Sequence, residues 1–133
     1  MVADSEASLD HPTVEAFIQA LAVRDFVALE ACLAPDVAFR ALLPGGVVEV
    51  GTDKEAADVL EHWFGVYDRF RLVGFDTSYL GNMIRIGYRV EGHADEDWWE
   101  VEQQAYCEAV DDRFVRVNLV CSGVYDRDPP DWA

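Results

Sequence analysis

The sequence predicts an α+β fold, with helices in the N-terminal half of the chain and antiparallel strands in the C-terminal half. Three observations predict it. Apolar residues recur at helical spacing in residues 10–23, and a wider helical stripe starts at Thr52. Residues 70–124 then alternate apolar and polar side chains in long runs separated by short polar turns. Of the 133 residues, 51% are hydrophobic, which is enough for one domain with a buried core.

The chain is strongly acidic, with a formal net charge of −16 and a pI of about 4.2. Nucleic acids and anionic membranes are poor partners for such a chain because both bind basic surfaces. No apolar run approaches the roughly 20 residues of a membrane-spanning helix, and residues 1–10 lack the apolar core of a signal peptide. We therefore expect a cytoplasmic protein with a frayed segment at residues 1–10, a single domain at 11–125 and a C-terminal tail at 126–133.

The N-terminal third is expected to form two helices and a small hairpin. Asp10 is a suitable N-cap for a helix that runs to about Val23. A short second helix is expected to run through Leu33 and to end at the Ala-Pro-Asp sequence of residues 34–36. Residues 37–43 and 47–50 then read as two strands joined by a Pro-Gly-Gly turn.

The third helix has the clearest start signal in the chain. Thr52 and Glu55 form a capping box, in which the Thr hydroxyl accepts a bond from a free backbone amide while the Glu side chain reaches back to another. The apolar stripe of this helix is Ala56, Val59, Leu60, Trp63, Phe64 and Tyr67. A stripe this wide and aromatic is expected to cover a sheet.

Four strands are expected after that helix. Residues 70–80 and 83–91 form one pair, an acidic loop follows at 92–97, and residues 98–109 and 114–124 form a long hairpin around Asp111-Asp112. The alternation favours a register in which Ala105 faces Val117, which requires a loop with an odd residue count, such as a type I turn plus a bulge.

The two faces of the long hairpin differ in character. The apolar face, which must be covered by the N-terminal half, carries Val101, Gln103, Ala105, Cys107, Val115, Val117, Leu119 and Cys121. The second face carries Glu100, Glu102, Gln104, Tyr106, Glu108, Phe114, Arg116, Asn118, Val120 and Ser122. Because nothing else in the chain is left to cover the second face, we expect a homodimer through it.

The order of elements over residues 11–125 resembles that of the nuclear-transport-factor-2-like superfamily. The sequences LAPDVAF, at the step into the first strand, and VGTDKEAADVLEHWF, at the entry to the third helix, are most similar to small SnoaL-like proteins. The resemblance implies a cone-shaped fold, in which a strongly curved, mostly antiparallel sheet wraps around three helices, commonly in a homodimer. It does not imply a reaction, since the superfamily includes ketosteroid isomerase, scytalone dehydratase, limonene epoxide hydrolase and polyketide cyclases.

Two positions depart from the ketosteroid isomerase pattern. The general base of that enzyme aligns near Ala41, and its first-helix Tyr aligns near Phe17, so neither polar group is present. Enolisation of the steroid isomerase type is therefore not predicted.

Gln103 is the polar member of the apolar hairpin face, and a buried amide must find hydrogen-bond partners. It is either a core residue bonded to the backbone or to Tyr88, or a group that orients a ligand. In the second case Gln103 and Tyr88, with the aromatic residues Trp63 and Tyr67, form the ligand site, and Arg40 of the first strand contributes to it.

Glu102 and Asp76 are the candidate acid–base residues if the protein is an enzyme. Glu102 would act as a base held by Arg40, whereas the other reading puts Arg85, Arg89, Glu100 and Glu102 in a cross-strand charge ladder outside the pocket.

The sequence thus predicts a pocket for a small, mostly apolar molecule with one or two oxygens, and predicts no cofactor and no metal site. An acid–base enzyme of the isomerase, dehydratase, cyclase or epoxide-hydrolase type is the first alternative. A structural dimerisation module with a filled cone is the second.

Overall fold

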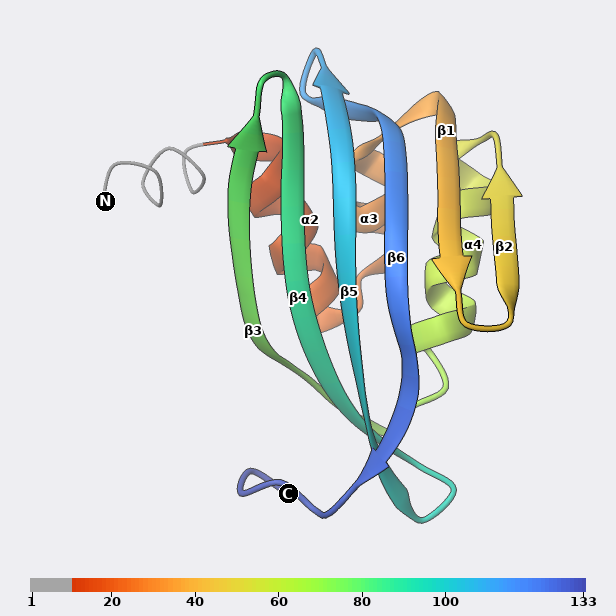
Figure 1. Cartoon of the computed structure of the whole chain (residues 1–133), viewed down its shortest axis with the longest axis vertical. Helices are drawn as coiled ribbons and strands as arrows, with labels where there is room; N and C mark the ends of the chain where they lie inside the picture. The colour runs from red at the N-terminus through yellow and green to blue at the C-terminus, as the bar shows by residue number, and fades with distance from the viewer. Residues whose placement is uncertain (1–10) are drawn as a thin grey trace.

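The computed structural model describes residues 11–133, and over this range three helices cover one face of a six-stranded sheet (Figure 1). The helices are α2 (Pro12–Val23), α3 (Phe26–Ala31) and α4 (Asp53–Phe64). The strands are β1 (Leu33–Leu43), β2 (Gly46–Val50), β3 (Arg69–Leu80), β4 (Met83–Ala94), β5 (Asp97–Val110) and β6 (Arg113–Arg127). The predicted α+β class is confirmed.

The sheet has the strand order β2-β1-β6-β5-β4-β3. All neighbouring strands are antiparallel except β1 and β6, which are parallel, so the prediction of a mostly antiparallel sheet is confirmed. In Figure 1 the long strands β3 to β6 curve in front of α2 and α3, while α4 lies behind β1 and β2.

The first two helices begin or end differently from their predicted bounds. The N-cap of α2 is His11, with no side-chain capping bond, and the predicted N-cap Asp10 lies outside the described residues. Helix α3 ends at Ala31, so Leu33 is the first residue of β1 rather than part of the helix. A physical reason is Pro35, which lacks an amide hydrogen and restricts the residue before it to extended backbone.

Helix α4 begins where the capping box predicts. Thr52 Oγ1 accepts a hydrogen bond from the Glu55 amide at 3.1 Å, and Glu55 Oε1 accepts one from the Gly51 amide at 3.3 Å. The reciprocal bond therefore reaches one residue further back than in a standard capping box, and it still satisfies an amide in front of the helix.

The predicted register of the β5–β6 hairpin is wrong by two residues. Ala105 pairs with Leu119 rather than with Val117. The connection is a two-residue turn in which Asp111 and Asp112 both have positive φ, 52° and 64°, and not a loop with an odd residue count. Because the error is an even number of residues, the inward positions around Ala105 stay inward.

Phe114 is a second correction in this hairpin, because the sequence analysis places it on the outer face. A bulge near Ala109 changes the alternation of β6. Phe114 is therefore fully buried, whereas Val115 is only partly buried.

The core lies between the helices and the inner face of the sheet. Within the helical stripe Ala56, Leu60 and Phe64 are almost completely buried, and across from them so are Val101, Ala105, Cys107, Val117 and Leu119. The expectation that the N-terminal half covers the apolar face of the hairpin is confirmed. No helix within residues 11–133 has both the length and the apolar character that crossing a membrane requires.

The C-terminal segment packs against the end of the sheet. Asp126 and Arg127, which the sequence analysis assigns to a tail, belong to β6. Trp132 donates a hydrogen bond from Nε1 to Glu91 Oε1 at 2.8 Å, and its ring meets Trp98 edge-on with centroids 5.0 Å apart. The carboxylate of Glu91 also pairs with Arg127, which explains how a carboxylate is buried there.

Candidate functional site

A cavity of about 210 Å³ lies between the end of α4 and the inner face of the sheet. Its wall is contributed by the end of β1 and the turn after it, by α4 and the residues that follow, and by β5 and β6. The lining residues are Leu43, Pro44, Trp63, Phe64, Tyr67, Val101, Gln103, Cys121, Gly123 and Val124. The surface of the cavity is therefore almost entirely apolar, with one amide side chain in it.

Gln103 is that amide. Only 2% of its surface is exposed, and its Oε1 accepts a hydrogen bond of 2.6 Å from the hydroxyl of Tyr88, which is itself buried. In this orientation the Tyr88 hydrogen has an acceptor, whereas a flipped amide would leave it without one. No residue of the described chain accepts a bond from Gln103 Nε2. The nitrogen is thus the group that Gln103 can offer to a ligand.

Aromatic rings form the wall opposite Gln103. Trp63 and Phe64 meet edge-on with centroids 6.3 Å apart, and Tyr67 lies 6.3 Å from Phe70. Burial, together with the neighbouring thiol of Cys121, raises the pKa of Tyr67 above its ordinary value, so the phenol stays protonated at neutral pH.

Gly92 on β4 makes the position of Tyr67 possible. A Cβ at residue 92 would lie 2.6 Å from the Tyr67 ring, so any larger residue would displace it. The sequence predicts a loop at Gly92, and the contact joins residues too far apart in sequence for a local pattern to reveal it.

Arg24 fixes the segment between Phe64 and Tyr67. It ends α2 in the left-handed conformation, with φ 54°, and its Nη1 donates to the carbonyl oxygens of Phe64 and Tyr67 at 3.1 and 2.6 Å. Its guanidinium also lies 4.9 Å from the centre of the Phe70 ring. In the sequence Arg24 only follows the predicted end of the first helix at about Val23, and no local signal predicts this longer-range role.

A β-bulge shapes the side of the cavity formed by β6. Gln103 pairs with Cys121 and Val101 with Val124, so Ser122 and Gly123 together oppose Glu102. The Ser122 hydroxyl accepts the Glu102 amide hydrogen at 3.0 Å. Gly123 has φ +89°, and a Cβ there would lie 2.9 Å from Pro44 Cγ. The bulge therefore brings the β1–β2 turn against β6 at the cavity wall.

The structure brings four of the five predicted ligand-site residues together. Gln103, Trp63 and Tyr67 line the cavity, and Tyr88 lies behind Gln103. Arg40 is on the opposite face of the sheet, with 61% of its side chain exposed and its Nε 3.8 Å from Glu49 Oε1. Its strand neighbours Phe39 and Ala41 are buried, and alternation therefore points Arg40 outward.

The acid–base candidates Glu102 and Asp76 are also on the outer face. Both line a shallow groove of about 280 Å³, together with Gly74, Phe75, Gly87, Tyr88, Arg89 and Gln104. Neither residue lines the inner cavity. The only titratable groups among the inner lining residues are the Tyr67 phenol and the Cys121 thiol.

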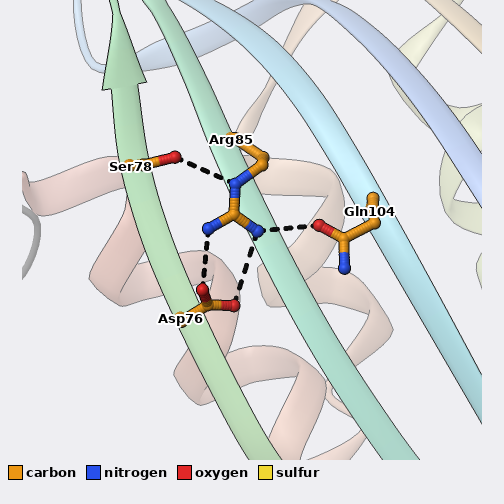
Figure 2. A network of polar contacts seen from close by, with 4 residues as sticks. All are labelled: Asp76, Ser78, Arg85 and Gln104. Carbon is orange, nitrogen blue, oxygen red and sulfur yellow. Dashed lines mark hydrogen bonds and ion pairs between the residues drawn. The ribbon is translucent and has the colours of Figure 1, made fainter.

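Asp76 is part of a polar network on that outer face (Figure 2). Arg85 Nη2 is 2.7 Å from Asp76 Oδ2, its Nη1 donates to Gln104 Oε1 at 2.7 Å, and its Nε donates to Ser78 Oγ at 2.9 Å. The hydrogen bond with Asp76 raises the pKa of Arg85. These contacts satisfy the guanidinium from three sides and fasten β3, β4 and β5 together.

The predicted charge ladder forms only in part. Arg89 and Glu102 are direct cross-strand partners, but neither has an ion-pair partner within the described residues. Glu100 instead approaches Arg127 at 3.9 Å. Over residues 11–133 no three His, Cys, Asp or Glu side chains converge as metal ligands.

Solved structures with the same architecture include proteins of several activities. An LEH-like epoxide hydrolase of M. tuberculosis has a TM-score of 0.64 and 17% identity, covering 90% of this chain and 85% of that one. A protein with a ketosteroid isomerase-like fold from Catenulispora acidiphila, solved with trimethylamine, has a TM-score of 0.67 and 12% identity, covering 80% and 82%. A phenazine biosynthesis-related protein of Pseudomonas aeruginosa has a TM-score of 0.66 and 10% identity, covering 88% and 84%.

The fold is that of the nuclear-transport-factor-2-like superfamily. The resemblance seen in the sequence is thereby confirmed for the fold. No protein-family model matches this sequence, and no curated protein matches it significantly. Since the neighbours are less than 25% identical and differ in activity, function has to be argued from the residues of this chain.

Proposed function

We propose that the protein binds a small, mostly apolar ligand with a hydrogen-bond acceptor, such as a carbonyl or ether oxygen, in the inner cavity. The observation that carries the proposal is the Gln103 amide, whose oxygen is already bonded to Tyr88 and whose nitrogen has no acceptor in the described chain. An apolar cavity with one oriented polar group is the usual form of a small-molecule site. A ligand oxygen would supply the missing acceptor.

The size of the cavity limits the ligand. A volume of 210 Å³ is about seven times the ~30 Å³ that a water molecule occupies in the liquid, so it suits a compact molecule such as a six-membered ring ketone. The aromatic wall of Trp63, Phe64 and Tyr67 favours an apolar ring or chain.

Binding is better supported than acid–base catalysis. General acid–base chemistry needs a proton-transfer group within hydrogen-bonding reach of the substrate. Glu102 and Asp76 face the outer groove, and Tyr67 has a raised pKa that keeps its proton in place. The alternative of a filled, purely structural cone is disfavoured by the open volume beside Gln103.

The experiment is a comparison of matched probes on one protein. Cyclohexanone should bind in competition with larger hydrophobic ketones and should quench or shift the fluorescence of Trp63. Cyclohexane, which has the ring without the acceptor, should bind at least about tenfold more weakly, since one hydrogen bond to a neutral donor contributes about 1.4 kcal/mol. Equal affinity for cyclohexanone and cyclohexane would show that Gln103 does not bind the ligand oxygen.

A fluorescence change can be assigned to Trp63 only if the other tryptophans do not respond to the ligand. Trp98 and Trp132 contact each other beyond Val101 of β5, and Trp99 is partly buried beside them, so a Trp63→Phe variant identifies the contribution of these three residues. A fluorescence response that persists in Trp63→Phe would place the ligand elsewhere.

We also propose that the outer face of the sheet is a contact between two copies of the chain. It exposes Val120, and it carries Arg89 and Glu102, which have no ion-pair partner within the described chain. A second copy related by a two-fold axis would offer each of these charges an opposite one. Sedimentation should show a dimer at micromolar concentration, whereas Arg89→Glu should shift it toward monomer. Wild type that stays monomeric would refute the proposal.

The acidity of the chain adds a further expectation for this dimer. Two copies of net charge −16 repel each other, and salt screens that repulsion. Association should therefore strengthen between low ionic strength and 0.15 M, where the Debye length is about 8 Å.

A further inference from the structure

Cys121 differs from the other two cysteines in its surroundings. Cys32 and Cys107 are buried in the core, and burial raises the pKa of both thiols, for Cys107 to about 12. Cys121 is only partly buried, is free, and lines the inner cavity. A thiol that a cavity makes accessible is open to chemistry, whereas thiols enclosed in a core are inert.

The register places Cys121 directly across from Gln103. The two are cross-strand partners of β5 and β6, so on one face their Cβ atoms are about 4.5–5.5 Å apart. Both side chains line the cavity. A ligand oxygen bonded to Gln103 Nε2 is therefore held beside the sulfur atom, and Gln103 is an independent indication that a ligand sits there.

The backbone of the bulge also contacts this thiol. The Gly123 amide, turned by the bulge, donates a hydrogen bond to Cys121 Sγ at 3.4 Å. This bond holds the sulfur in place at the cavity wall. The thiolate is the nucleophilic form of cysteine.

We propose that Cys121 adds covalently to α,β-unsaturated carbonyl compounds held in the cavity. This inference rests on the proposed function and specifies its ligand class. The carbonyl oxygen accepts a hydrogen bond from Gln103 Nε2, and the sulfur forms a bond to the β-carbon as the carbon–carbon double bond opens.

The step is balanced without a co-reactant. Electron density from the opened double bond moves to the carbonyl oxygen, where the Gln103 amide stabilises the enolate. The thiol proton leaves to solvent when the thiolate forms, and a proton from solvent is then taken up at the α-carbon. The product is a saturated thioether, and the reverse elimination restores the free thiol.

Intact-protein mass spectrometry tests the proposal with 2-cyclohexen-1-one as the probe. The folded chain should gain one enone per molecule, located at Cys121 by peptide mapping, while Cys32 and Cys107 stay unmodified. Cys121→Ala should lose the adduct. Cys32→Ala should react like the parent and serves as the matched control.

The role of the cavity is tested by rate. Gln103→Leu should form the adduct at least tenfold more slowly, and excess cyclohexanone should slow the parent by competition. Modification that proceeds equally fast in Gln103→Leu, or equally fast in urea-unfolded chain, would overturn the proposal, because Cys121 would then be an ordinary accessible thiol.

The two proposals fail in different ways. If cyclohexanone binds but no enone adduct forms, the covalent step is refuted and the binding function stands. If cyclohexanone neither binds nor competes, the proposed function itself is refuted.

Discussion

The Tyr88–Gln103 pair makes a quantitative prediction about stability. Both side chains are at most 3% exposed and share one hydrogen bond of 2.6 Å. Tyr88→Phe leaves the Gln103 oxygen without a donor, and Gln103→Leu leaves the Tyr88 hydroxyl without an acceptor. Each single substitution should therefore cost about 1–3 kcal/mol in the free energy of unfolding, the cost of a buried polar group that loses its partner.

The double variant should be much more stable than the sum of the two singles predicts. Replacing both partners by apolar groups of similar shape is nearly neutral, so the interaction free energy in the cycle should be about 2–6 kcal/mol in magnitude, the sum of the two single costs. In thermal unfolding each single should lose roughly 3–5 °C per kcal/mol, intermediate between the values for smaller and larger domains.

The assay is urea unfolding of the four proteins followed by circular dichroism. Tyr106→Phe is the matched control, because Tyr106 lies on the outer face of β5, the strand that carries Gln103. Its free energy of unfolding should stay within about 0.5 kcal/mol of that of the parent. Additive single effects would refute the reasoning, because they would show that the two groups have separate partners. Single variants as stable as the Tyr106→Phe control would also refute the reasoning.

Three further perturbations test other parts of the fold. Thr52→Ala should cost about 1 kcal/mol in urea unfolding, because the amide of Glu55 loses its acceptor, and an unchanged midpoint would contradict the capping assignment. Gly123→Ala should cost about 1–3 kcal/mol, since it combines a positive φ with a contact on Pro44, and a stability equal to that of the parent would show that the turn can move away. Burial raises the pKa of Cys107 from 9.0 to about 12, so its contribution is fully present below pH 9 and is lost as pH rises toward 12. Above pH 9 the parent should therefore lose stability more steeply than Cys107→Ala, by up to about 1.4 kcal/mol per pH unit, and parallel curves would contradict the burial argument.

The features that the sequence predicts best are those that depend on neighbouring residues or on strand alternation. The Thr52 capping box is complete within four residues, and the helix starts there. Gln103 is assigned correctly to the inner face although the predicted register is wrong, because an error of two residues leaves the alternation unchanged. Strand alternation also explains the wrong prediction for Arg40. Its neighbours Phe39 and Ala41 are buried, so Arg40 points outward.

The features that the sequence does not predict depend on irregular backbone or on distant contacts. Phe114 points inward because of a bulge near Ala109, and no residue type near it in β6 indicates that bulge. Arg24 holds a segment about forty residues away, and Trp132 reaches Glu91 across a similar separation. Such contacts exist only once the sheet has curved and its ends have come together.

The bulge at Gly123 is the most consequential of these irregularities. It moves the β1–β2 turn against β6, and the Gly123 amide donates to the Cys121 sulfur. A glycine within a strand suggests a bulge or a close approach of backbone. Gly123 therefore carries a signal in the sequence, whereas its partner Pro44 is known only from the fold.

The side-chain amide signals of Gln103 in a ¹⁵N–¹H NMR titration test the central claim most directly. Cyclohexanone should shift both Nε2 hydrogen signals in a saturable manner, with the larger change on the hydrogen that donates to the ketone oxygen. Cyclohexane should leave them nearly unchanged, and assignment is confirmed by their loss in Gln103→Leu. Saturable binding of the ketone elsewhere, with the Gln103 amide signals unmoved, would contradict the account.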